Sequence, residues 1–146
     1  MTTCPYCHRP AELVTGATLF PAHPTLRDKN FWRCDPCGAH VGTHRADIPG
    51  VQKGLGDGTV PMGTLANAET RSWRKTLHEE FDALWLPQRL YVGARRVARR
   101  PFKDRGQAYV WLAQALSIPQ DECHIAMFSV EQCKAAYVAI LERKMK

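Results

Sequence analysis

Four cysteines near the start of the chain form two C-x-x-C pairs, a spacing that supplies the ligands of a tetrahedral zinc ion. Cys4 and Cys7 make the first pair, Cys34 and Cys37 make the second, and 26 residues separate the pairs. This interval is slightly longer than in a usual zinc ribbon, but it leaves room for strands that bring the second pair back to the first. Four thiolates leave the metal no open position, so the spacing predicts one structural Zn²⁺.

The first pair has a second interpretation, because Cys-Pro-Tyr-Cys is also the dithiol motif of glutaredoxins. Thr59-Val60-Pro61 is similar to the cis-proline segment of that family. A thioredoxin-like dithiol follows a buried strand and opens a helix, whereas only three residues precede Cys4 and Pro10 would interrupt the helix. A redox centre would also leave the second pair unexplained, so we interpret both pairs as metal ligands.

Histidines and aspartates supply further candidates for metal chemistry. His40 and His44 follow the second pair closely enough to replace a cysteine ligand or to donate hydrogen bonds beside the site. His78 and Asp82 are one helical turn apart and share a helix face. One hypothesis is that these two side chains bind a second, catalytic metal ion together with His44 and Asp47.

Two later cysteines and a histidine are a third possible ligand set. Cys123 and His124 are adjacent, and Cys133 follows ten residues later. Cys133 lies on an apolar stripe, where a buried free cysteine behaves as a small hydrophobic residue. Packing is therefore the interpretation that the pattern favours.

A cluster of six cations within eleven residues is opposed only by Asp104. Such a cluster is typical of a segment that neutralises nucleic-acid phosphates, and equally of a solvated loop between two helices. The six residues are Arg95, Arg96, Arg99, Arg100, Lys103 and Arg105.

The net charge of +6 is unevenly distributed along the chain. Residues 1–66 carry six basic and five acidic side chains, whereas residues 67–146 carry fourteen basic and nine acidic side chains. Four thiolates with one zinc ion would lower the total to about +4. The charge permits nucleic acid as a partner but does not require it.

Short strands and turns must position the cysteines. The sequence predicts two short strands, at residues 12–14 and at the aromatic stretch 31–33. A turn-rich connection joins them, which is the layout of a zinc ribbon. We assign residues 1–47 to this module. Residues 48–64 contain five glycines and two prolines, a composition that predicts a flexible linker or surface loop.

Three amphipathic helices follow, in a second module over residues 65–146 with a basic insertion at 88–105. The first helix is predicted over residues 67–85 and the second over 105–117. Ser129 with Gln132 is a capping-box pattern that begins the third. Three tryptophans are expected to form the core of this module. The predicted fold class is thus α+β: a four-cysteine zinc ribbon of short antiparallel strands plus a three-helix unit.

The composition excludes several classes of protein. No apolar run approaches the roughly 18 residues of a membrane span, and the first residues do not resemble a signal peptide. Six cysteines in 146 residues are too few for a disulfide scaffold. We therefore expect a cytoplasmic protein in a reducing compartment, and no membrane partner.

Several sequence blocks, taken together, resemble a family of small zinc-finger-containing proteins of phages and prophages. The resemblance implies a phage origin, a location in the host cytoplasm and zinc on the four N-terminal cysteines; the family is a domain of unknown function. Residues 48–60 and 88–104 look like insertions relative to the family pattern. The blocks are Cys4-Pro5-Tyr6-Cys7, Trp32-Arg33-Cys34-Asp35-Pro36-Cys37-Gly38-Ala39, Val41-Gly42-Thr43-His44, residues 61–69, residues 78–85, residues 108–113 and residues 123–128.

Three functions are consistent with these features. The first is a non-enzymatic binding protein that contacts nucleic acid through the basic insertion. The second is an inhibitor that binds a host protein or an anti-phage defence complex, with charge steering the docking. The third is a metal-dependent nuclease that uses His44, Asp47, His78 and Asp82. The sequence predicts no oligomeric state.

Overall fold

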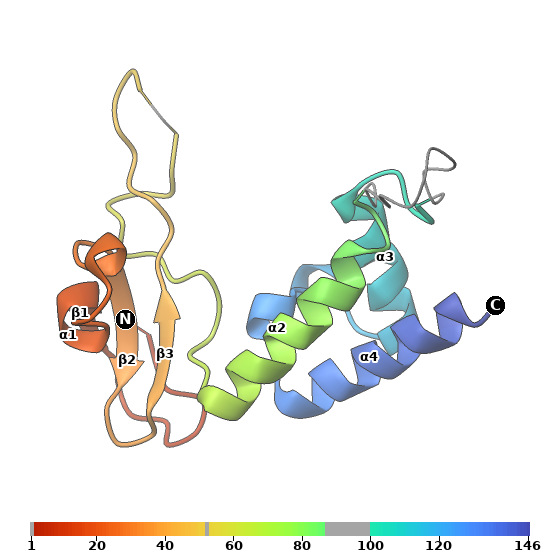
Figure 1. Cartoon of the computed structure of the whole chain (residues 1–146), viewed down its shortest axis with the longest axis horizontal. Coiled ribbons are helices and arrows are strands. Elements are labelled where there is room, and N and C mark those ends of the chain that lie inside the picture. The colour runs from red at the N-terminus through yellow and green to blue at the C-terminus, as the bar shows by residue number, and fades with distance from the viewer. Residues whose placement is uncertain (1, 52, 87–99) are drawn as a thin grey trace. The chain divides into compact units, whose positions relative to one another are not determined.

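The chain forms two compact units, Met1–Glu69 and Thr70–Lys146. The computed structural model describes residues 2–51, 53–86 and 100–146, and its elements are labelled in Figure 1. The Gly/Pro-rich residues 48–64 belong to the first unit together with the cysteine pairs.

A three-stranded antiparallel sheet forms the centre of the first unit. The strands are β1 (Glu12–Thr15), β2 (Asn30–Cys34) and β3 (Ala39–Gly42), in the order β1-β2-β3. The sequence pattern predicted β1 and β2. It did not predict β3, which follows the turn of the second cysteine pair.

The two faces of β2 have different neighbours, because side chains alternate along a strand. Trp32 and Cys34 share one face, and β3 places Val41 and Ala39 opposite them. This face packs against the buried Leu65 in a small core around the cysteines.

The opposite face of β2 carries an aromatic cluster. The ring of Phe20 lies 5.3 Å from that of Phe31 and 5.4 Å from that of His40, measured between centroids in edge-to-face arrangements. His40 therefore faces this cluster on the side of the sheet away from Trp32 and Cys34.

The excursion between β1 and β2 contains the short helix α1 (Gly16–Leu19) and the 3₁₀ helix η1 (Pro24–Leu26). Gly16 is buried, and a Cβ at this position would overlap the carbonyl of Leu26. Only glycine permits this close backbone approach, which folds the excursion back onto the end of β1.

After β3 the chain extends beyond the sheet and returns along the same strand (Figure 1). Backbone bridges pair Thr43 with Pro61 and His40 with Ala66. Strand β3 begins at the β2–β3 turn. The loop therefore projects from the opposite end of β3.

The second unit contains α2 (Ala68–Asp82, which begins two residues before the unit boundary), α3 (Arg105–Leu116) and α4 (Val130–Lys144). The 3₁₀ helices η2 (Gln120–Glu122) and η3 (Ile125–Met127) connect α3 to α4. Asp104 caps α3 by accepting a hydrogen bond from the backbone N–H of Gln107 at 2.9 Å. Ser129 and Gln132 form the predicted capping box at the start of α4.

The core of the second unit is aliphatic and aromatic, with the tryptophans at its edge. Trp73, Trp85 and Trp111 are only partly buried, which corrects the expectation that they form its centre. The fully buried large side chains of this core are Leu77, Phe81, Leu84, Leu112, Ile125, Phe128 and Ile140.

Not every apolar residue on the helical stripes of α3 and α4 is buried. Ala115 and Leu141 lie at apolar positions of these helices and are exposed. Tyr109, Ala113 and Ala136 are buried in their place. In α3 the apolar residues run almost without interruption, so periodicity alone does not select the buried face.

The predicted fold class is confirmed: the protein is α+β, with an N-terminal antiparallel sheet beside a four-cysteine cluster, followed by three helices. Among the described residues, no helix combines the length and the apolar character needed to cross a membrane.

Candidate metal centre

The first cysteine pair lies in a tight turn before β1. The carbonyl of Cys4 accepts a hydrogen bond from the backbone N–H of His8 at 2.9 Å, and the Cys4 N–H donates to the carbonyl of Arg9 at 2.9 Å. This ring closes only because His8 adopts a left-handed conformation, with φ of 61°. Both thiols of the pair thereby point to the same side of the turn.

The second pair lies in the turn between β2 and β3. Cys34 is the last residue of β2, and Gly38 closes the turn by donating its N–H to the carbonyl of Asp35 at 3.2 Å. Gly38 has φ of 60°. The turn that joins the strands therefore also presents the second pair of ligands.

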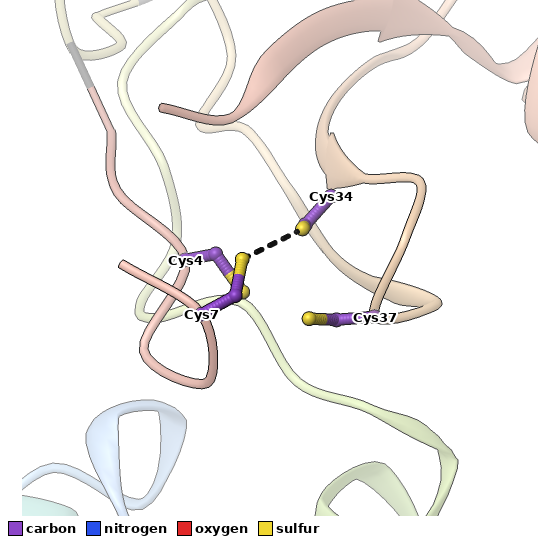
Figure 2. A group of neighbouring side chains, drawn as sticks. All are labelled: Cys4, Cys7, Cys34 and Cys37. Carbon is purple, nitrogen blue, oxygen red and sulfur yellow. Dashed lines mark hydrogen bonds between the residues drawn. The ribbon is translucent and has the colours of Figure 1, made fainter. Parts of the chain in front are cut away.

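The four sulfur atoms gather in one group in which no two are more than 4.8 Å apart. Figure 2 shows the two turns facing each other. The Sγ atoms of Cys7 and Cys34 are 3.5 Å apart. Zinc–sulfur bonds of about 2.3 Å at tetrahedral angles require sulfurs about 3.8 Å apart. The cluster thus fits one zinc ion without rearrangement of the backbone.

Charge explains why a cation belongs at this site. The backbone N–H of Arg9 lowers the pKa of Cys7 to about 7. The hydrogen bond with Cys7, reinforced by burial, raises the pKa of Cys37 to about 12. Cys7 and Cys37 therefore do not ionise together near neutral pH. A divalent cation removes this restriction, because it stabilises all four thiolates at once.

Packing shields part of the cysteine cluster from solvent. Cys4 and Cys34 are buried, Cys7 and Cys37 are half-buried, and Trp32 packs against them. Four cysteines complete the coordination of zinc, so the ion has a structural role. The prediction of one structural zinc is confirmed.

Two hydrogen bonds connect the site to distant parts of the first unit. The Tyr6 hydroxyl accepts a hydrogen bond from the backbone N–H of Asn67 at 3.0 Å, which fixes the chain just before α2. The indole N–H of Trp32 donates to the carbonyl of Thr59 at 2.7 Å. Motif spacing gave no indication of either contact, because each joins residues 27 or more positions apart.

The other predicted ligands do not join this group. Within the part of the chain that the structure describes, the four cysteines are the one set of three or more His, Cys, Asp or Glu side chains that lies close enough to hold an ion. His44 and Asp47 belong to the first unit, and His78 and Asp82 to the second. The catalytic role proposed for these four residues stays a prediction.

Each of these side chains has local surroundings of its own. Asp47 accepts a hydrogen bond from the backbone N–H of Gly54, and Asp82 accepts one from the indole N–H of Trp85 at 3.1 Å. Burial lowers the pKa of His78 below its ordinary value. Asp82 opposes this effect, and the nearby Arg105 and Arg74 add to it.

The later cysteines are core residues of the second unit. Cys123 and Cys133 are buried among apolar side chains, and burial raises the pKa of each thiol, to about 11 for Cys123. His124 is exposed and its ring lies 5.0 Å from that of Tyr109. The packing interpretation of the two cysteines agrees with this burial.

The basic cluster is described only in part. Arg95, Arg96 and Arg99 lie outside the described residues. Arg100, Lys103 and Arg105 are exposed where the chain enters α3. Arg100 donates to the carbonyl of Trp85 at 3.3 Å, and the guanidinium of Arg105 lies 5.5 Å from the ring centre of Tyr109.

Two cysteine turns that flank a small antiparallel sheet define a zinc-finger protein of the ribbon type. The chain belongs to the family DUF3268, described as a zinc-finger-containing domain, whose model matches residues 1–143. No curated protein and no solved structure matches the chain. Family membership accounts for the zinc site and leaves the specific role open.

Proposed function

We propose that this is a phage-encoded, non-enzymatic nucleic-acid-binding protein that acts in the host cytoplasm and contacts phosphates through its helical unit. The phage origin and the location rest on the family resemblance of the sequence blocks. The absence of an open zinc position supports a binding role over a catalytic one for the metal. The observation that carries the proposal is the segregation of charge between the two units.

The first unit has six basic and six acidic side chains, so it is neutral before zinc is counted and has a charge of −2 with a tetrathiolate zinc. The second unit has fourteen basic and eight acidic side chains, a surplus of +6. All of the positive surplus therefore belongs to the helical unit. A polyanion is the partner that such a surplus attracts.

The exposed cations at the start of α3 add a local argument. Among the described residues, no carboxylate forms an ion pair with Arg100, Lys103 or Arg105. The carboxylate of Asp104 caps α3 and already lies at the positive end of its helix dipole. A phosphate group near this place would therefore be bound by the three cations, which outnumber that one carboxylate.

The test compares two triple variants with equal loss of charge. Replacing Arg100, Lys103 and Arg105 by alanine should weaken binding to a DNA or RNA oligonucleotide. It should also flatten the dependence of log affinity on log salt by about 0.9 per lost phosphate contact. The matched control replaces the exposed cations Arg27, Lys75 and Lys146, and its salt slope should remain that of the wild type.

Equal behaviour of the two triple variants would contradict the proposal, because net charge alone would then explain binding. Failure of the wild-type protein to bind either oligonucleotide at low salt would contradict it as well. A third variant with alanine at Arg95, Arg96 and Arg99 measures the contribution of the remaining cluster by the same slope.

A further inference from the structure

A cavity of about 980 Å³ lies in the first unit between the chain before β2 and the loop that follows β3. Its apolar lining consists of Leu26, Phe31, Ile48, Leu55 and Met62, and we call it the loop cavity. Its volume is at the upper end of the range for ligand pockets, about 300–1,000 Å³. It is therefore large enough for several side chains of a partner.

The loop cavity is bordered by an unusual concentration of exposed apolar side chains. Thirteen large apolar residues are exposed in the described chain, and five of them lie between positions 48 and 62. Three of these five line the cavity: Ile48 is 45% exposed, Leu55 51% and Met62 49%. Clustered exposure of this kind marks a binding surface, whereas single exposed residues do not.

Internal hydrogen bonds hold the loop in a defined conformation. In this conformation its apolar side chains Ile48, Leu55 and Met62 remain exposed. The N–H of His44 donates to the carbonyl of Val60 at 2.8 Å, and the N–H of Leu55 donates to that of Arg45 at 2.9 Å. The side chain of Asn30 donates to the carbonyl of Gly58 at 3.1 Å. The cavity is thus formed before any partner binds.

The charged groups around the cavity favour an acidic partner. Lys29, Arg45 and Lys53 line it, and all three are exposed. Among the acidic lining residues, Asp57 accepts hydrogen bonds from the N–H and the hydroxyl of Thr59, at 3.0 and 2.6 Å. Asp28 also lines the cavity, and hydrogen bonds from neutral donors leave Asp57 charged, so the lining has three cations against two carboxylates, a surplus of one positive charge.

Two other occupants fit this surface less well. A symmetric contact with a second copy of the chain would place each set of three cations against the same set. A nucleic acid would place its phosphates against the exposed apolar side chains of the cavity, with which phosphates do not interact. Both conflicts disappear for a peptide that carries apolar and acidic side chains together.

We propose that the loop cavity binds an acidic, apolar peptide segment of another protein. The apolar side chains of the peptide enter the cavity between Phe31, Leu55 and Met62. The carboxylates of the peptide pair with Lys29, Arg45 and Lys53. This site lies in the first unit, so it is independent of the phosphate contacts proposed for the second.

The experiment selects peptides from a random displayed library on the full-length, zinc-loaded protein and measures the affinity of the enriched sequences. The expected peptides combine leucine, isoleucine or phenylalanine with aspartate or glutamate. Leu55→Ser should weaken their binding about tenfold or more, because it removes one buried apolar contact. Lys53→Glu should weaken it as well, and more strongly at low salt.

Val138→Ser is the matched control, because Val138 is 52% exposed and lies on α4 of the other unit. Its peptide affinity should equal that of the wild type, and zinc content and circular dichroism verify the fold of every variant. The proposal is overturned if no sequence is enriched or if enriched peptides bind Leu55→Ser as tightly as the wild type. It is also overturned if Leu55→Ser abolishes self-association or oligonucleotide binding instead of peptide binding.

Discussion

His8 and Gly38 occupy the same position in the two cysteine turns and adopt the same backbone conformation. Each follows the second cysteine of its pair, and their φ angles are 61° and 60°. Glycine reaches this left-handed region at no steric cost, whereas a side chain costs roughly 1–2 kcal/mol. The first turn therefore contains a strained residue that the second turn avoids.

We expect His8→Gly to raise the free energy of unfolding of the zinc-loaded first unit by about 1 kcal/mol. Gly38→Ala should lower it by a similar amount, because it introduces the strain at the equivalent position. Thermal unfolding of the zinc-loaded protein measures both changes. Opposite signs for the two variants are the essential result, and a loss of stability in His8→Gly would show that its imidazole has a stabilising contact.

Removal of zinc should unfold the first unit and leave the helices of the second. The core of the first unit consists of little more than the cysteines, Ala11, Ala39 and Leu65, whereas the second has a core with no zinc ligand. A chelator should therefore abolish the resolved indole resonance of Trp32 and retain most of the helical circular dichroism. Cys37→Ser should reproduce this state without a chelator, while complete loss of helical signal would contradict the expectation.

The stability of the second unit should decrease in mild acid because of His78. Burial depresses the pKa of this imidazole below its ordinary value of 6.5 in the folded state. The unfolded chain therefore binds the proton first as pH falls through about 6.5, and the stabilisation present above that pH is lost. Urea unfolding, followed by helical circular dichroism at about pH 7.5 and about pH 5.5, measures the loss.

Two variants identify His78 as the source of that pH dependence. His78→Gln should reduce the difference between the two pH values. Asp82→Asn should lower the pKa of His78 further, because the carboxylate of Asp82 is the group that raises it. An NMR titration that places the pKa of His78 at or above its ordinary value would contradict the prediction.

Tyr109→Phe should stabilise the second unit, by about 1 kcal/mol. Tyr109 is only 7% exposed, and among the described residues its buried hydroxyl has no hydrogen-bond partner. Phenylalanine keeps the ring that lies 4.4 Å from Phe81 and removes the unsatisfied hydroxyl. Chemical denaturation of this variant and of the control Tyr137→Phe tests the idea, and a less stable Tyr109→Phe would imply a hidden partner for the hydroxyl.

The sequence predicted those features that depend on short spacings. C-x-x-C pairs imply a tetrahedral site whatever the rest of the chain does, and the Ser129–Gln132 capping box joins residues only three positions apart. The loop after β3 was different, because its composition predicted irregular backbone. Its order comes from contacts such as that between Trp32 and Thr59, 27 residues apart, which no local pattern specifies.

Strand β2 carries the metal cluster on one side and the loop cavity on the other. Trp32 packs against the cysteines and holds the carbonyl of Thr59, while its neighbour Phe31 lines the cavity. Because removal of zinc is expected to unfold this unit, a peptide that binds the loop cavity would favour the zinc-loaded protein, and zinc and peptide would each raise the affinity of the other by the same factor. A metal that performs no chemistry would thus make recognition by this protein sensitive to the supply of zinc.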